Sequence, residues 1–106
     1  MRCLILLLLS GGLQIHPLAV HADGIQEVNE LSLDCINKTS VESCQRALLR
    51  IEELQTFASA KGKYSCQTRL LGLSADLIMF KFNDGDKGRG LETIGQIKDF
   101  CEDLYK

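Results

Sequence analysis

Four cysteines constrain the fold of this chain more than any other feature. They are Cys35, Cys44, Cys66 and Cys101, and each lies near one end of a segment whose apolar residues recur every three or four positions. That period is typical of an amphipathic helix, and no segment shows the sustained two-residue alternation of a half-buried strand. We therefore expect an all-α fold, a small four-helix bundle stapled by two disulfides.

The apolar residues define four expected helices. They run over about residues 25–36, 40–61, 65–82 and 91–105. Thr39 is expected to cap the second helix in a capping box with Glu42, and Gly62 is expected to end it. The third helix is apolar over most of its circumference, so it is either central in the bundle or buries its surplus against a partner. Gly72 and Ala75 are expected to be close-packing positions of this helix.

The direction of the helices decides how the cysteines pair. Short connections make successive helices antiparallel, so Cys35 and Cys44 lie at one end of the bundle and Cys66 and Cys101 at the other. A disulfide cannot join Cα atoms more than about 7 Å apart, so only the pairs Cys35–Cys44 and Cys66–Cys101 are compatible with the bundle. No two of these cysteines have the close spacing of a zinc site, and we expect no metal and no cofactor.

Residues 1–22 have the pattern of a cleaved secretion signal peptide. Arg2 precedes a short apolar run, and Val20 and Ala22 place small or modest side chains at the −3 and −1 positions of a cleavage site. The run is too short for a membrane span, which needs about 20 residues. We expect residues 23–106 to form a single helical domain that is periplasmic or secreted, where disulfides form, and that does not bind a membrane.

The composition of the expected mature chain leaves little room for an enzyme. Both histidines, His16 and His21, lie in the predicted signal peptide. This excludes His-based triads, Cys–His dyads and His-bound zinc, and we expect no catalytic residues. The whole chain has a formal net charge of −2 with interspersed charges, so nucleic acid is not an expected partner.

Residues 83–90, Asn-Asp-Gly-Asp-Lys-Gly-Arg-Gly, form the most distinctive polar stretch. Its glycines and charged residues predict a loop. An EF-hand calcium site does not fit, because Gly88 and Gly95 stand at ligand positions. The loop is then either a plain connector or a surface that binds a partner. In the second case the contacts come from Asp84, Asp86, Lys87 and Arg89.

The cysteines also follow a recognisable order along the chain. After the signal peptide, one Cys ends a short helix in Leu31-Ser32-Leu33-Asp34-Cys35, and the next opens a long helix in Ser43-Cys44; the others follow in Tyr64-Ser65-Cys66 and Phe100-Cys101. This order resembles the Tai/Rap-type immunity proteins of bacterial type VI secretion, which are small, all-helical and periplasmic. The resemblance implies an inhibitor that binds and occludes a cell-wall amidase effector. It also implies a homodimer, which the surplus apolar surface of the third helix would suit.

Two other functions are compatible with the same residues. One is a secreted carrier of a small apolar ligand, with a cavity among Leu70, Leu73, Leu77 and Phe80. The other is a periplasmic stress protein. Without histidine in the mature chain, a pH trigger of such a protein would depend on carboxylates below about pH 5.

Overall fold

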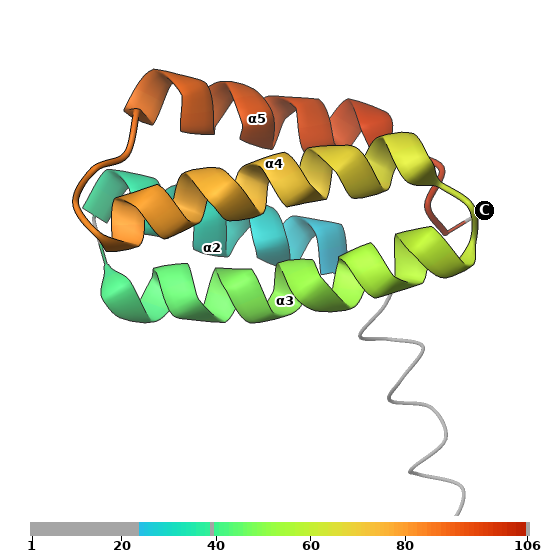
Figure 1. Cartoon of the computed structure of the whole chain (residues 1–106), viewed down its shortest axis with the longest axis horizontal. Helices are drawn as coiled ribbons and strands as arrows, with labels where there is room; N and C mark the ends of the chain where they lie inside the picture. The colour runs from blue at the N-terminus through green and yellow to red at the C-terminus, as the bar shows by residue number, and fades with distance from the viewer. Residues whose placement is uncertain (1–23, 39, 106) are drawn as a thin grey trace, which may run out of the picture.

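The computed structural model describes residues 24–38 and 40–105, which form an antiparallel bundle of four helices (Figure 1). The helices are α2 (Gly24–Lys38), α3 (Val41–Ala60), α4 (Tyr64–Lys81) and α5 (Lys87–Phe100). Helices α2 and α4 each contact all three of the others. The expected all-α fold is confirmed. The predicted signal peptide lies outside the described residues, and no helix within them is long and apolar enough to cross a membrane.

A single apolar core fills the space between the four helices. Its fully buried large side chains are Val28, Ile51, Leu70, Leu73, Leu77, Ile97 and Leu104. They recur at helical spacing along each helix, as the apolar pattern predicts. Leu104 belongs to the turns that follow α5, so the C-terminal turns are held against the bundle.

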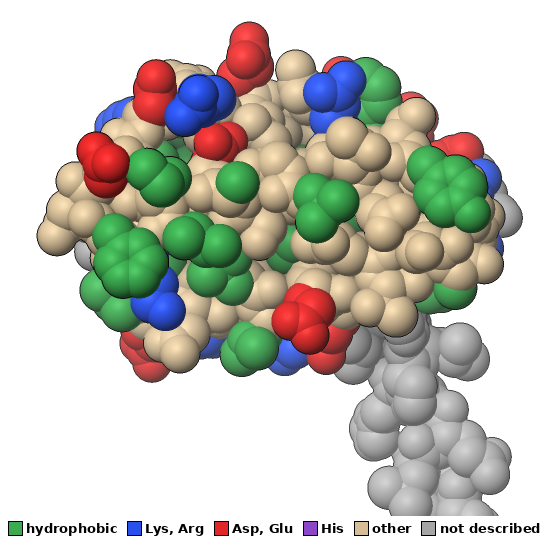
Figure 2. Space-filling view, in the orientation of Figure 1, with side chains coloured by type: hydrophobic (Ala, Val, Ile, Leu, Met, Phe, Trp, Pro, Cys, Tyr) green, Lys and Arg blue, Asp and Glu red, His purple; other side chains and the backbone are tan. Residues whose placement is uncertain are grey.

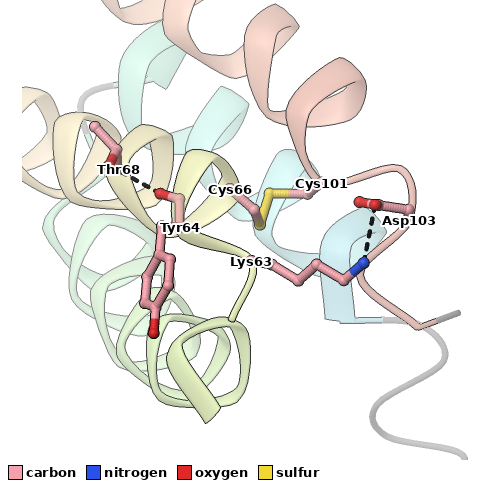
Figure 3. Close-up of a disulfide and its surroundings, with 6 residues drawn as sticks. All are labelled: Lys63, Tyr64, Cys66, Thr68, Cys101 and Asp103. Carbon is pink, nitrogen blue, oxygen red and sulfur yellow. Dashed lines mark hydrogen bonds and ion pairs between the residues drawn. A yellow bond between two sulfur atoms is a disulfide. The ribbon is translucent and has the colours of Figure 1, made fainter. Parts of the chain in front are cut away.

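Two disulfides link neighbouring helices at opposite ends of the bundle. Cys35–Cys44 joins α2 to α3 with a Cα–Cα distance of 4.6 Å, and Cys66–Cys101 joins α4 to the end of α5 with a distance of 4.7 Å. The pairing predicted from antiparallel helices is confirmed. Figure 3 shows that Lys63 lies beside the second bridge, where its Nζ is 3.0 Å from Asp103 Oδ2.

The start of α3 differs by one residue from the prediction. Ser40 is the N-cap, and its hydroxyl oxygen accepts a hydrogen bond from the Ser43 backbone N–H at 3.2 Å. The expected capping box of Thr39 with Glu42 is therefore wrong. The prediction placed the N-cap one residue too early. Thr39 and Ser40 are both good N-cap residues, and the sequence pattern alone does not distinguish them.

The end of α3 agrees with the prediction. Gly62 has a φ of 72°, in the left-handed region that favours glycine. Its N–H donates to the Ser59 carbonyl, and the Lys63 N–H donates to the Ala58 carbonyl. This pair of bonds is the Schellman motif, which satisfies the last carbonyls of a helix and here turns the chain into α4.

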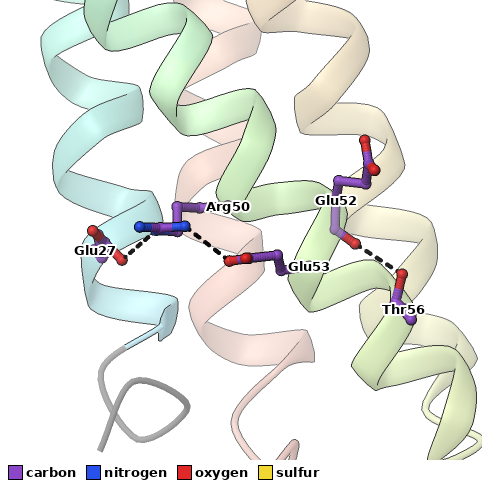
Figure 4. Close-up of polar contacts among 5 residues, drawn as sticks. All are labelled: Glu27, Arg50, Glu52, Glu53 and Thr56. Atoms are coloured by element: carbon purple, nitrogen blue, oxygen red, sulfur yellow. Dashed lines mark hydrogen bonds and ion pairs between the residues drawn. The ribbon is translucent and has the colours of Figure 1, made fainter. Parts of the chain in front are cut away.

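A guanidinium group links α2 to α3 on the surface of the bundle (Figure 4). Arg50 Nε donates to Glu27 Oε1 of α2 and Arg50 Nη1 donates to Glu53 Oε1 of α3, both at 3.0 Å. The negative charge of Glu27, and next that of Glu53, raises the pKa of Arg50 above its ordinary value. These side chains are partly exposed, so each pair contributes at most about 1 kcal/mol. Only the pair of Arg50 with Glu27 joins α3 to α2; the pair with Glu53 lies within α3.

Ser32 of α2 is fully buried, and within the described residues its hydroxyl has no hydrogen-bond partner. An unpaired buried hydroxyl costs about 1–3 kcal/mol. We therefore expect Ser32→Ala to raise the free energy of unfolding by about 1 kcal/mol, measured by urea denaturation followed by circular dichroism. Ser40→Ala is the matched control and should lower it by about 1 kcal/mol, because it removes the cap of α3. A Ser32→Ala protein less stable than wild type would contradict this prediction.

Candidate partner-binding site

The chain leaves α4 in a turn whose backbone is held by hydrogen bonds. Asn83 adopts a left-handed conformation with a φ of 62°, and its N–H donates to the Phe80 carbonyl at 3.0 Å. The Asp84 N–H donates to the Met79 carbonyl at 2.8 Å. This is a second Schellman motif, with Asn in place of Gly. The first half of the connection to α5 therefore has a defined conformation.

The second half of this connection is held by packing and by a cap. Gly85 lies so close to the ring of Phe80 that a Cβ atom at Gly85 would overlap the ring carbons. Asp86 is the N-cap of α5, and its Oδ1 accepts a hydrogen bond from the Arg89 N–H at 3.1 Å. A cap of this kind contributes about 1 kcal/mol to stability. We refer to residues 82–86 as the α4–α5 turn.

The loop predicted over residues 83–90 is shorter than expected. Helix α5 begins at Lys87, so residues 87–90 form its first turn, and it ends at Phe100 rather than near residue 105. Gly90 packs against α2, where a Cβ atom would lie only 2.7 Å from Ile36 Cδ1. The prediction was wrong because glycines suggest a loop by composition, whereas the cap and this close contact stabilise a helix.

The four predicted contact residues have different roles. Asp86 caps α5, as described above. Arg89 Nε lies 3.3 Å from Asp76 Oδ1 of α4, and Thr93 Oγ1 donates to Asp76 Oδ2 at 3.0 Å, so Arg89 helps to hold α5 against α4. Asp84 and Lys87 are exposed, and within the described residues neither forms a side-chain hydrogen bond or ion pair. Asp84 and Lys87 are thus the predicted residues that remain available to a partner.

Phe82 is a further candidate contact residue, outside the four that the composition of the loop predicted. It is the C-cap of α4 and is 70% exposed, more than any other large hydrophobic side chain among the described residues. Phe80 and Phe82 are two positions apart on a helix and therefore point to different sides. This spacing predicts that one of the two rings is buried and the other is exposed. The packing of Phe80 against Gly85 decides that Phe82 is the exposed one.

The outer face of α4 is unusually apolar. Figure 2 shows hydrophobic side chains spread across the face of the molecule over this helix. The exposed large apolar side chains of α4 and its C-cap are Tyr64, Leu71, Ile78, Met79 and Phe82. Helix α4 is therefore central in the bundle and also carries a surplus of apolar surface. Gly72 and Ala75 both lie on the exposed side of α4, and a Cβ at Gly72 would have no atom within 4 Å. The close-packing role predicted for these two residues is therefore wrong.

The geometry gives less support to a ligand carrier. Leu70, Leu73 and Leu77, which a carrier would place around its ligand, are fully buried and pack within the core. A hollow of about 610 Å³ beside the Cys66–Cys101 bridge is open and lined mainly by polar residues such as Lys63 and Asp99. Within residues 24–38 and 40–105, no three His, Cys, Asp or Glu side chains are grouped as metal ligands.

Comparisons with known proteins do not assign a function to this chain. No protein family model matches this chain, and neither the search of curated proteins nor that of solved structures found a match. Within the described residues, the α4–α5 turn and the outer face of α4 are surfaces where large apolar side chains are exposed.

Proposed function

We propose that this protein is an inhibitor that acts outside the cytoplasm by binding another protein through its α4–α5 turn. The observation that carries the proposal is the 70% exposure of Phe82 on a turn whose backbone is held by hydrogen bonds. A large aromatic side chain on a backbone that is already fixed needs no ordering of the main chain on binding, so less conformational entropy is lost. Aromatic anchors of this kind dominate the energy of protein interfaces.

In this proposal, the charged residues beside Phe82 form the polar rim of the interface around this anchor. Asp84 and Lys87 are exposed and carry opposite charges within a few residues of the ring. Rim charges of both signs favour a specific orientation and raise the association rate more than the affinity. A turn that begins with an exposed aromatic residue can insert into a concave surface, and enzyme active sites are concave.

For the partner we propose a cell-wall amidase effector of type VI secretion, which this immunity protein would bind and occlude in the periplasm. The order of the cysteines, which resembles that of the Tai/Rap-type immunity proteins, supports this choice. The two disulfides support an oxidising compartment. In this proposal the chain itself catalyses nothing, and its contribution is steric.

The test uses the disulfide-bonded chain from residue 23 onward as bait in periplasmic extracts and against purified cell-wall amidases. We expect one amidase to be retained and its hydrolysis of peptidoglycan to be lost on binding. Phe82→Asp should weaken the affinity about 100-fold, because removal of an interface anchor costs on the order of 2–4 kcal/mol. Leu49→Asp is the matched control, since Leu49 is 60% exposed on α3, away from the turn.

Two results would contradict the proposal. One is that no cell-wall hydrolase is retained or inhibited by the wild-type chain. The other is that Phe82→Asp and Leu49→Asp bind and inhibit equally well. Circular dichroism spectra of both variants should match the wild type, because both side chains are exposed, and this excludes misfolding as the cause of lost binding.

A further inference from the structure

The outer face of α4 carries a row of exposed residues that the core does not use. Their spacing alternates between four and three positions, and they are Tyr64, Thr68, Leu71, Ala75, Ile78 and Phe82. We call these residues the α4 row. Figure 2 shows hydrophobic side chains across this face, whereas the opposite side of the helix, with Leu70, Leu73 and Leu77, fills the core. Helices that present such a row to another protein dock in a groove of that protein.

The α4 row contains no charged side chain. The charged residues of α4 are Arg69, Asp76 and Lys81, and all three lie outside the row. The Arg69 guanidinium lies 4.2 Å from the centre of the Phe100 ring, and Asp76 is paired with Arg89, so both are engaged with α5. A partner that covers the row therefore has to match its shape and its apolar character rather than a charge.

The middle of the row can be buried at little cost in lost hydrogen bonds. Leu71, Ala75 and Ile78 have no polar side-chain atoms. The Thr68 hydroxyl already donates to the Tyr64 carbonyl at 2.9 Å (Figure 3). Removal of water from this part of the helix thus leaves no side-chain polar group unpaired.

The α4–α5 turn by itself is small for a specific interface. It covers only residues 82–86, whereas a standard interface buries about 800 Å² and about 20–30 residues on each partner. The α4 row is continuous with this turn, because Phe82 belongs to both. The row extends about 27 Å along the helix and about 11 Å across it, which adds roughly 300 Å². An interface that begins at the turn therefore gains most apolar area by continuing along α4.

We propose that the α4 row is the second part of the inhibitor's interface and lies along the substrate cleft of the amidase, with the α4–α5 turn at one end of that cleft. This inference rests on the proposed function and adds the shape and chemistry of the partner's surface. An enzyme that cuts a polymer binds the strand along an extended cleft, which a single helix about 11 Å wide can occupy lengthwise. The cleft residues opposite the row are apolar or uncharged, because a charge buried against the row would have no partner.

In this arrangement α4 takes the place of the polymer strand. Phe82 lies at one end of the row and Tyr64 about 27 Å away at the other, so contacts far from the turn contribute to the affinity. The inhibitor and peptidoglycan then exclude each other along the cleft and not only at the bond that is cut. The inhibition is therefore competitive: the chain raises the KM of the amidase for peptidoglycan and leaves its kcat unchanged.

The first test measures the affinity of single variants for the amidase that the wild-type chain retains. We expect Leu71→Asp to weaken the affinity about 30-fold or more, because it places a carboxylate against an apolar surface. Leu71 lies about 16 Å along the helix from Phe82, so this effect does not arise in the turn. Leu71 is 51% exposed, and circular dichroism should show a normal fold. Leu49→Asp, with a similarly exposed leucine on α3, is the control and should bind like the wild type.

The second test locates the row on the amidase. A photoreactive amino acid replaces Ala75, which is exposed in the middle of the row. We expect cross-links to residues of the amidase's substrate cleft, and a loss of these cross-links when soluble peptidoglycan strands are added. The same amino acid in place of Leu49 is the control and should give no cross-links to the cleft.

The outcomes separate this inference from the proposed function. If Phe82→Asp weakens binding while Leu71→Asp binds like the wild type, the turn alone carries the inhibition, and the role of the α4 row is overturned. Cross-links from position 75 to an amidase surface outside the cleft would also overturn it. Cross-links from position 75 to a second copy of this chain within the complex would assign the row to self-association instead. If the wild-type chain binds no amidase, the proposed function and this inference fail together.

Discussion

Removal of the Cys66–Cys101 disulfide is expected to lower the free energy of unfolding by about 4 kcal/mol, and removal of Cys35–Cys44 by about 3 kcal/mol. The two bridges join residues 35 and 9 positions apart. A cross-link that closes a longer loop removes more conformational entropy from the unfolded chain. The free energy of unfolding of a small domain is only about 5–15 kcal/mol in total. We therefore expect the chain with both bridges reduced to lose most of its helical structure near room temperature.

The measurement is urea denaturation, followed by far-ultraviolet circular dichroism, of two double variants. They are Cys66→Ala with Cys101→Ala, and Cys35→Ala with Cys44→Ala. All four cysteines are buried, so each double variant leaves a similarly small space and the comparison is matched. The Cys35–Cys44 variant also keeps the Arg50 contact between α2 and α3. A larger loss of stability without Cys35–Cys44 than without Cys66–Cys101 would contradict the loop-entropy explanation.

Two glycine substitutions should change stability in opposite directions. Gly85→Ala is expected to lower the free energy of unfolding by about 1–3 kcal/mol, because its Cβ would overlap the Phe80 ring. Phe80 is 8% exposed and packs in the core, so its ring has little room to move. Gly72→Ala is expected to raise the free energy of unfolding by about 1 kcal/mol, since it replaces an exposed glycine inside a helix.

The same urea titrations measure both glycine variants. Gly85→Ala should also weaken binding through the α4–α5 turn, because the turn must move to admit the new methyl group. Gly72→Ala is the matched control for that binding measurement, since it adds the same group at an open position of α4. If Gly85→Ala proved as stable as Gly72→Ala, the close contact between Gly85 and Phe80 would not constrain the turn.

The disulfide pairing was predictable from the sequence for a simple geometric reason. Helical periodicity locates each cysteine near a particular helix end, and short connections make neighbouring helices antiparallel. The distance limit of a disulfide then leaves the single pairing that the structure has, Cys35–Cys44 with Cys66–Cys101. The glycine end of α3 was predictable as well, because Gly62 adopts a backbone conformation that other residues avoid.

The candidate site was less predictable, because contacts between distant residues form it. Residues 87–90 are glycine-rich and look like a loop, but Gly90 packs on Ile36 and Arg89 pairs with Asp76, so these residues begin α5. The sequence indicates that Asp86 and Arg89 are charged, not that they are already engaged within the chain. The apolar pattern of α4 does not indicate that Phe82 would lie on the exposed side of the helix, together with Leu71 and Ile78.

The amino-acid sequence by itself determined the number of helices, their approximate bounds and the pairing of the cysteines. These properties depend on periodicity, caps and chain connectivity, which are local or follow from the antiparallel order. Only the tertiary structure decided which side of α4 faces the core, which loop residues are free and where the apolar surplus lies. Those outcomes depend on how α2, α3 and α5 pack around α4. The spacing of residues along the chain does not specify these contacts between helices.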